Sequence, residues 1–195
     1  MNIKSIFAAF AFAAASIMTA PVSATVIMNN TSTPICDLCT INSTLAVSSH
    51  FIIQDLNVLL SNLNHTYDQD LVISIFAPTG TSVILSNRRG GSGNNFQNVV
   101  FDDSATQSIS QGSAPFNNTF RPEQALSIFN GIDAFGTWTL RVSDVQSQDT
   151  GTLKSWGLDI TPVATGSAVP EPGAAVLFGL GLLALATSRR EAAKK

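Results

Sequence analysis

The sequence predicts an all-β domain of the sandwich or barrel type. Short runs of alternating polarity recur, turn residues separate them, and no long segment of 25–168 has a helical period. The clearest run is 137–143, where Trp138, Leu140 and Val142 alternate with Thr, Arg and Ser. Because successive side chains of a strand point to opposite faces, this run predicts one buried and one solvated face.

The other expected strands follow the same logic. Residues 51–60 form a β-prone run, and 71–77 is nearly continuously apolar, which is typical of a strand buried on both faces. Residues 78–80, Pro-Thr-Gly, predict a type I turn into a returning strand at 82–85.

A second alternating strand is expected near the end of the domain. Residues 148–151 predict a turn, and Trp156, Leu158 and Ile160 then share one face. We expect both tryptophans of the chain to lie in the core. In the loop 87–95, which is rich in Gly and Asn, the two arginines at 88 and 89 are interpreted as solvated charges, with contact to an acidic partner as the alternative.

The first 24 residues have the pattern of a secretory signal peptide. Lys4 supplies the positive charge, 6–18 is an apolar run broken by one serine, and Val22-Ser23-Ala24 matches a small-residue cleavage site. We therefore expect an N-terminal signal helix, cleavage after Ala24 and export of the protein.

The last 27 residues, 169–195, contain another tripartite pattern. Val169-Pro170-Glu171-Pro172 precedes an apolar stretch at 173–186, and Arg189, Arg190, Lys194 and Lys195 follow it. A spanning helix needs about 20 apolar residues, and basic residues after it favour a cytoplasmic end. In this order the elements resemble the PEP-CTERM sorting signal of Gram-negative bacteria. The resemblance implies processing by an exosortase, a membrane cysteine protease, and a C-terminal membrane helix before processing.

Residues 25–168 are acidic once the two ends are set aside. They contain eleven acidic and five basic residues, a formal charge of -6, against -3 for the whole chain. The basic excess of a nucleic-acid-binding protein is missing, so that class is excluded. The whole chain is 45% hydrophobic and 12% charged, which excludes an acidic disordered chain. A segment of this length is large enough for one core.

Two cysteines, Cys36 and Cys39, have the C-x-x-C spacing. In an exported protein this favours a local disulfide. A redox-active pair is an alternative, but that motif needs a helix after the first cysteine within a βαβ unit. Pro34 precedes the pair and 40–44 is polar without helical periodicity. A zinc site would need two further ligands, and the chain has two histidines.

The order of strands and turns carries a second resemblance. The matching segments are His65-Thr66-Tyr67, Asp70-Leu71, 78–81, 90–96, 101–105, 115–116, 120–122, 129–131, 136–140, 149–153 and Trp156. Together they resemble the P domain, or P/Homo B domain, of the subtilisin-like proprotein convertases, from about residue 45 to 160. The resemblance implies a jelly-roll-like β-sandwich of the galactose-binding-like group. Gln69, Ala77 and Asn94 depart from the family pattern, which commonly has Gly, Ser and Asp there.

The chain therefore divides into five expected parts. They are the signal peptide 1–24, an N-terminal segment 25–44 with the cysteine pair, the P domain 45–162, a linker 163–168 and the sorting signal 169–195.

We expect no catalytic residues. A subtilisin-like protease needs Ser, His and Asp in one constellation. His50 and His65 are the two histidines, neither lies in a recognisable catalytic motif, and no serine has the Gly-x-Ser-x-Gly pattern. His65 stands where the P-domain pattern has a non-catalytic histidine, and the convertase P domain itself has no catalytic residues.

Four aspartates are candidates for a Ca²⁺ site, and no other cofactor is expected. Asp68 and Asp70 share a turn, and Asp102 and Asp103 share a strand end. Ca²⁺ takes six to eight oxygen ligands, largely from Asp, Glu and carbonyl groups, and the galactose-binding-like sandwiches implied above often hold a structural Ca²⁺ in such loops. The alternative is that these acids cap turns, where Asp is favoured.

The expected role is that of an accessory or interaction module at the cell surface or in the extracellular matrix. In the convertases the P domain supports the folding and stability of the catalytic domain. The expected partners are the exosortase, the membrane before processing, and either a subtilisin-like protease or an exopolysaccharide. Carbohydrate binding is the alternative function, although Tyr67 is the single tyrosine available for stacking on a sugar.

Overall fold

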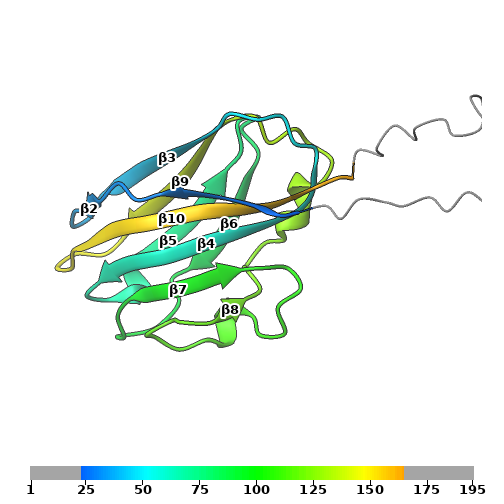
Figure 1. Ribbon diagram of the computed structural model, residues 1–195. Helices are drawn as coiled ribbons and strands as arrows, with labels where there is room; N and C mark the ends of the chain where they lie inside the picture. Colours follow the sequence, from blue (N-terminus) through cyan, green and yellow to red (C-terminus); the bar gives the residue numbers. More distant parts are fainter. Residues whose placement is uncertain (1–22, 165–195) are drawn as a thin grey trace, which may run out of the picture. The chain divides into compact units, whose positions relative to one another are not determined.

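Residues 23–164 form an all-β structure of two sheets, which confirms the all-β part of the expected fold class (Figure 1). The computed structural model describes these residues. The expected signal helix, most of the linker and the sorting signal lie outside them. Within 23–164, no helix has the length and hydrophobicity required to cross a membrane.

The larger sheet has six strands. Its order is β1 (Thr25–Asn29), β10 (Gly151–Pro162), β4 (Ile53–His65), β7 (Phe96–Phe101) and β8 (Thr119–Phe120), and β2 (Thr33–Ile35) also pairs with β10. Neighbouring strands are antiparallel except β7 and β8, which are parallel.

The smaller sheet has four antiparallel strands. Its order is β3 (Thr40–Val47), β9 (Gly136–Asp144), β5 (Leu71–Phe76) and β6 (Ser82–Asn87). Three short 3-10 helices lie in the connections: η1 (Asp68–Asp70), η2 (Ile109–Gln111) and η3 (Leu126–Phe129). The segment 25–44 supplies β1, β2 and the start of β3, so the folded unit extends beyond 45–162.

The core lies between the two sheets and contains both tryptophans. Trp138 of β9 and Trp156 of β10 are fully buried, as the alternation predicted. Trp138 packs edge-on against Phe129, with ring centroids 5.2 Å apart. The indole Nε1 of Trp156 donates a hydrogen bond of 2.9 Å to the hydroxyl of Ser43 in the facing sheet. The two sheets are therefore joined by a specific polar contact as well as by apolar packing.

The strand β5 differs from its expectation. Its apolar run was expected to be buried on both faces, but Leu71, Ile73 and Ile75 are buried while the alternate residues are half-exposed. One face of this sheet packs on the core and the other meets solvent, where the guanidinium of Arg141 lies 4.2 Å from the centre of the Phe76 ring. The predicted hairpin from β5 to β6 is confirmed.

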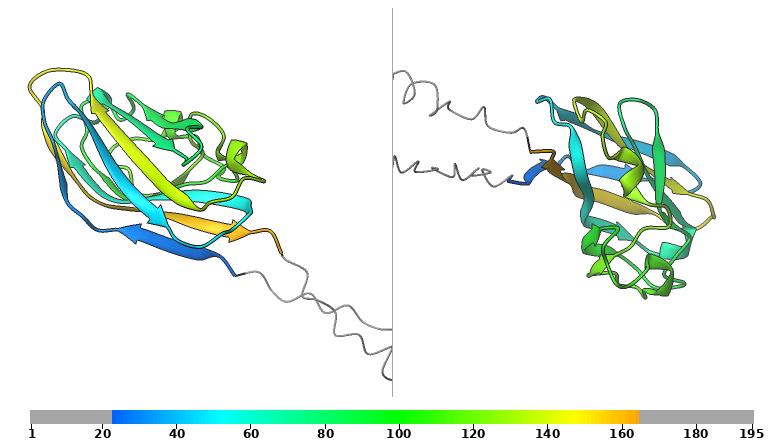
Figure 2. Two further views of the ribbon diagram at one scale, coloured as in Figure 1. Left: turned by 90° about the horizontal axis from the view of Figure 1, so that it is seen from above. Right: turned by 90° about the vertical axis from the view of Figure 1, so that its right-hand side faces the viewer.

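The turn before β10 carries the chain from one sheet to the other, because β9 and β10 belong to different sheets. It lies at the end of the molecule that also holds the β2–β3 turn (Figure 2), and the backbone N–H of Gln148 donates to Asp37 Oδ1 at 3.0 Å. This end also receives η1, since the N–H of Val145 donates to the carbonyl of Asp70 at 2.9 Å. Three connections that are distant in sequence therefore meet there.

Candidate functional site

A polar pocket of about 340 Å³ lies where these connections meet. Its walls come from η1 and the residue before it, from the start of the β6–β7 loop, and from the β9–β10 turn. The lining side chains are polar or aromatic: Tyr67, Gln69, Asp70, Arg88, Gln146, Ser147, Gln148 and Asp149.

Backbone hydrogen bonds hold the wall formed by η1. The N–H groups of Asp68 and Gln69 donate to the carbonyls of Gly93 and Gly91, at 2.9 and 3.2 Å. The side chain of Arg88 is held in turn, because its Nε donates to the Gln69 carbonyl at 3.1 Å. Arg88 also has a left-handed backbone, with φ 56°. The Gly-rich loop thereby holds η1, and η1 in turn holds the side chain of Arg88.

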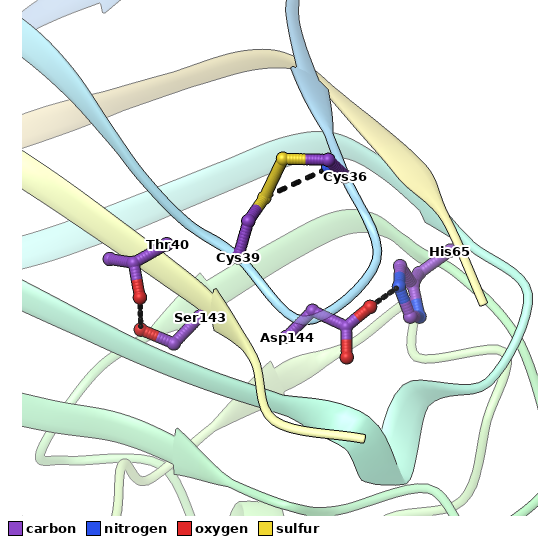
Figure 3. The surroundings of a disulfide bond; sticks show 6 residues. All are labelled: Cys36, Cys39, Thr40, His65, Ser143 and Asp144. Atoms are coloured by element: carbon purple, nitrogen blue, oxygen red, sulfur yellow. Dashed lines mark hydrogen bonds and ion pairs between the residues drawn. A yellow bond between two sulfur atoms is a disulfide. The ribbon is translucent and has the colours of Figure 1, made fainter. Parts of the chain in front are cut away.

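The disulfide supports the opposite wall (Figure 3). Cys36 and Cys39 form a disulfide in the β2–β3 turn, with 5.5 Å between their Cα atoms. Between them, Asp37 accepts the hydrogen bond from Gln148 that anchors the β9–β10 turn. Gln148 has a φ of 90°, an uncommon backbone conformation for a non-glycine residue.

A buried His–Asp pair joins β4 to the end of β9, close to the disulfide (Figure 3). His65 Nε2 lies 3.3 Å from Asp144 Oδ2, its Nδ1 lies 2.9 Å from the carbonyl of Tyr67, and both side chains are fully buried. Within 23–164 this imidazole makes no hydrogen bond to a serine hydroxyl. His65 therefore links two strands from a fully buried position.

His50 lies in a different part of the molecule. Its Nδ1 is 2.6 Å from Asp133 Oδ2, its ring stacks on Phe135 at 4.2 Å, and its side chain is exposed. The hydrogen bond from His50 lowers the pKa of Asp133. In the described part of the chain this imidazole, too, has no hydroxyl partner.

Carboxylates gather at the floor of the pocket. Asp70 is 5% exposed, and its pKa is raised by burial first and then by the charges of Asp144 and Asp149, whereas His65 lowers it. Asp149 Oδ1 accepts a hydrogen bond of 2.7 Å from Thr66. A side-chain hydrogen bond between Asp70 and Asp149 also raises the pKa of Asp70, so the pocket presents two carboxyl groups in contact.

Asp68 lies behind this wall and is fully buried. Its Oδ1 accepts the N–H of Asn95 at 2.9 Å, while its Oδ2 has no hydrogen-bond partner. Burial raises the pKa of this carboxyl to about 7. A side chain at Gly90 would place its Cβ 2.9 Å from that of Asp68, so the loop needs a glycine there.

The four predicted Ca²⁺ ligands do not come together. Asp68 accepts a hydrogen bond from Asn95, the residue before β7, whereas Asp102 and Asp103 come directly after β7. The six residues of this strand separate Asp68 from Asp102 and Asp103 by about 20 Å. Both oxygens of Asp103 accept backbone N–H groups of η3, from Leu126 and Ser127, at 2.9 and 2.8 Å. Residues 23–164 contain no group of three His, Cys, Asp or Glu arranged to hold a metal. Ca²⁺ binding by either pair alone stays a prediction.

The sequence did not single out most of the pocket. Arg88 is exposed, as expected of a solvated charge, and it also lines the pocket, whereas Arg89 is half-buried and pairs with Glu123. The three glutamines had no motif, because they come from two connections that only the fold brings together. The signal that was available was Tyr67, the one tyrosine, beside two closely spaced aspartates.

Comparison with known proteins decides the family. The family model of the proprotein convertase P-domain matches residues 53–160, which is more than half of the chain. The chain belongs to the proprotein convertase P-domain family. A second model, the PEP-CTERM protein-sorting motif, matches residues 168–190. That motif indicates an exported protein that is anchored in the membrane at its C-terminus before processing.

The curated relatives are much longer proteins. The chain is 33% identical to leupeptin-inactivating enzyme 1 of Streptomyces exfoliatus over 95 residues, covering 49% of this chain and 16% of that protein. It is 30% identical to a calcium-dependent protease of Nostoc sp. over 130 residues, covering 65% and 17%. A serine protease of Aeromonas sobria is a similar solved structure, with 21% identity and a TM-score of 0.42, covering 71% of this chain and 27% of that one. The chain spans about a sixth of the length of these curated relatives.

Proposed function

We propose that this protein is an exported, non-catalytic P-domain module that acts beside a secreted subtilisin-like protease and is sorted to the cell surface by an exosortase. The observation that carries the proposal is the extent of the family match. The P domain accounts for most of the folded unit, whereas the matching region is about a sixth of the protease relatives. The jelly-roll connectivity and galactose-binding-like grouping implied by the resemblance belong to the same proposal.

The histidine environments support a non-catalytic role. A serine protease needs an imidazole that bonds both to an aspartate and to a nucleophilic serine. His65 has the aspartate but is fully buried, and His50 is exposed but stacked on Phe135. A fluorogenic peptide assay on the purified protein tests this: we expect no turnover that a serine-protease inhibitor blocks, and such turnover would refute the role.

The sorting signal is tested by fractionation. With Pro170, Glu171 and Pro172 all changed to Ala, a tagged copy should stay in the membrane fraction, because the exosortase no longer recognises it. The intact copy should appear at the cell surface or in the medium. A triple alanine variant in the neighbouring linker, at Val163, Thr165 and Ser167, is the matched control and should behave like the intact protein. Equal distribution of all three copies would contradict sorting through this motif.

The partner is tested by crosslinking in the host. A tagged copy should recover a subtilisin-like protease that reacts with a serine-directed activity probe. Recovery of the exosortase alone would remove the protease association and leave the sorting part intact.

A further inference from the structure

We propose that an exposed apolar patch formed by His50, Ile52 and Phe135 is the surface on which the exosortase docks while it processes the chain. These three residues are called the end patch below. The proposal adds a contact surface to the sorting step and so rests on the proposed function. It is independent of the protease association, because the exosortase acts on the chain whether or not a protease is bound elsewhere.

The end patch lies where β10 ends. β10 begins beside β2, near the disulfide, and ends at Pro162, which pairs with Ile53 (Figure 1). The preceding residue, Ile52, forms a bridge with Asp133 in the connection from η3 to β9, and its carbonyl accepts the N–H of Val163 at 2.7 Å. The patch therefore stands at the point where the C-terminal segment leaves the folded unit, and the twelve residues of β10 separate it from the disulfide by about 35 Å.

The side chains of the end patch are exposed but held in place. Ile52 is 49% exposed and Phe135 is 48% exposed, and Phe135 is the one aromatic residue among the exposed large apolar residues of 23–164. The His50 ring stacks on Phe135 with centroids 4.2 Å apart, and Asp133 holds that imidazole through a contact of 2.6 Å to its Nδ1. Aromatic residues are enriched in protein interfaces, and a ring that is ordered before association loses less conformational entropy on binding.

The short distance along the chain from the patch to the sorting motif favours the exosortase as the occupant. Val163, whose N–H bonds to Ile52, is six residues before Val169, the first residue of the motif. Six fully extended residues span about 20 Å, and the spacing between neighbouring strands adds about 5 Å. An exosortase that holds the motif at 169–172 is therefore within about 25 Å of Ile52. No comparable restriction brings it to the disulfide end of the domain.

The charges around the end patch favour a protein partner over the lipid surface. Asp133 lies within the patch, and Asp55 lies near the start of β4. The pKa of Asp55 is raised by burial and then by the charges of Asp102, Asp103 and Asp159, so these four carboxyl groups gather close to the patch. None of the five basic residues of 25–168 falls within 50–55 or 133–135. Anionic lipid headgroups attract basic segments and repel carboxylates, whereas an apolar protein surface with a basic rim would complement this end.

The experiment follows processing of the full tagged chain in its host by pulse-chase labelling. Phe135→Ser and Ile52→Ser should each slow the conversion to the processed form at least about fivefold, because the exposed half of a large apolar side chain leaves on the order of 100 Å² to be buried on docking. Phe135→Tyr keeps the ring and should be processed at the unaltered rate. Leu38→Ser makes the same change at a residue that is 62% exposed in the β2–β3 turn, and it is the matched control that should also keep the unaltered rate. Since all three positions are exposed, the purified full-length variants should retain the melting temperature of the unaltered chain.

Photocrosslinking tests the contact without removing the patch. A photoreactive phenylalanine derivative replaces Phe135 or Leu38, in cells whose tagged exosortase has its nucleophilic cysteine changed to Ala so that the substrate stays bound. Position 135 should crosslink to the exosortase and position 38 should not.

The docking surface is overturned if the two serine variants of the patch are processed like Leu38→Ser, if position 135 crosslinks to lipid alone or to nothing, or if both positions crosslink equally to the exosortase. In each of these cases the intact chain is still processed and the triple alanine variant of the motif is not, so sorting by the exosortase stands without the docking surface. If the intact chain is not processed, the proposed sorting and the docking surface fail together.

Discussion

Changing Asp68 to Asn should remove a pH dependence from the stability of this protein. The Asp68 side chain is fully buried, and one of its oxygens has no hydrogen-bond partner. Burial raises the pKa of the carboxyl to about 7, and the N–H of Asn95 lowers it by a smaller amount. The carboxyl is thus protonated in the folded protein at pH values where the unfolded chain has lost that proton.

The direction of the change in stability with pH follows from proton binding. Because the pKa is higher in the folded state than in the unfolded chain, the folded state binds more protons between about pH 4 and 7, and stability falls as the pH rises through this window. At about 1.4 kcal/mol per pKa unit, the rise from 3.8 to about 7 corresponds to about 4 kcal/mol lost between the two ends of the window. This is a large part of the total stability of a typical domain.

Asparagine keeps the acceptor for the Asn95 N–H but cannot ionise. Its unpaired amide N–H costs about 1–3 kcal/mol at every pH. This cost lowers the free energy of unfolding by the same amount throughout and leaves its dependence on pH unchanged. Urea unfolding at pH 5 and pH 8, followed by fluorescence of the buried tryptophans, measures both the constant cost of the asparagine and the pH-dependent part of the free energy of unfolding. Between pH 5 and pH 8 the unaltered protein should lose about 2–3 kcal/mol more than Asp68→Asn, because this interval covers about two of the three pKa units.

The control is Asp102→Asn, which changes an aspartate at the opposite end of β7 whose Oδ1 accepts a turn N–H at 2.7 Å. It should retain the pH dependence of the unaltered protein. If Asp68→Asn and the unaltered protein lose the same free energy between pH 5 and pH 8, the buried carboxyl is not the cause and the reasoning is refuted.

Two further predictions concern the strands and turns that support the pocket. Gly151→Ala would drive a Cβ into the carbonyl oxygen of Asn64 on the neighbouring strand, so urea unfolding should show a loss of about 3 kcal/mol. Gly91 has nothing within 4 Å but has a left-handed backbone with φ 56°, so the same change there should cost about 1–2 kcal/mol, and equal losses would contradict the packing argument. Changing Cys36 and Cys39 together to Ser opens a loop closed over a sequence separation of 3, and the loop-entropy relation gives a loss of about 2 kcal/mol. Abolished folding would show that the bridge does more than close a local turn.

The strand alternation was the most reliable part of the sequence. Trp138 and Trp156 were expected in the core because a period of two places alternate side chains on one face, and burial of that face stabilises the strand wherever its partners lie. The same reasoning failed at β5, because an apolar run does not say whether a second layer covers the other face. There a single arginine on Phe76 takes the place of that layer.

The pairing of strands could not be read from local pattern. The turn expected at 148–151 is present, but its sequence does not say that it joins strands of different sheets, since β10 pairs with β1, β2 and β4. Turn chemistry specifies how the chain reverses over a few residues, while the choice of partner depends on burial summed over the whole domain.

By itself, the sequence determined the all-β class, the family and the C-terminal sorting motif, since each depends on local order: strand periodicity, a series of turn motifs, and Val169-Pro170-Glu171-Pro172 before an apolar stretch. The tertiary structure alone decided which charged side chains lie close to one another. It separated Asp68 from Asp102 by the length of a strand, buried His65 against Asp144, and brought Arg88 and Asp149 to one pocket. Distances between side chains from different connections follow from strand pairing, and strand pairing is a property of the whole chain.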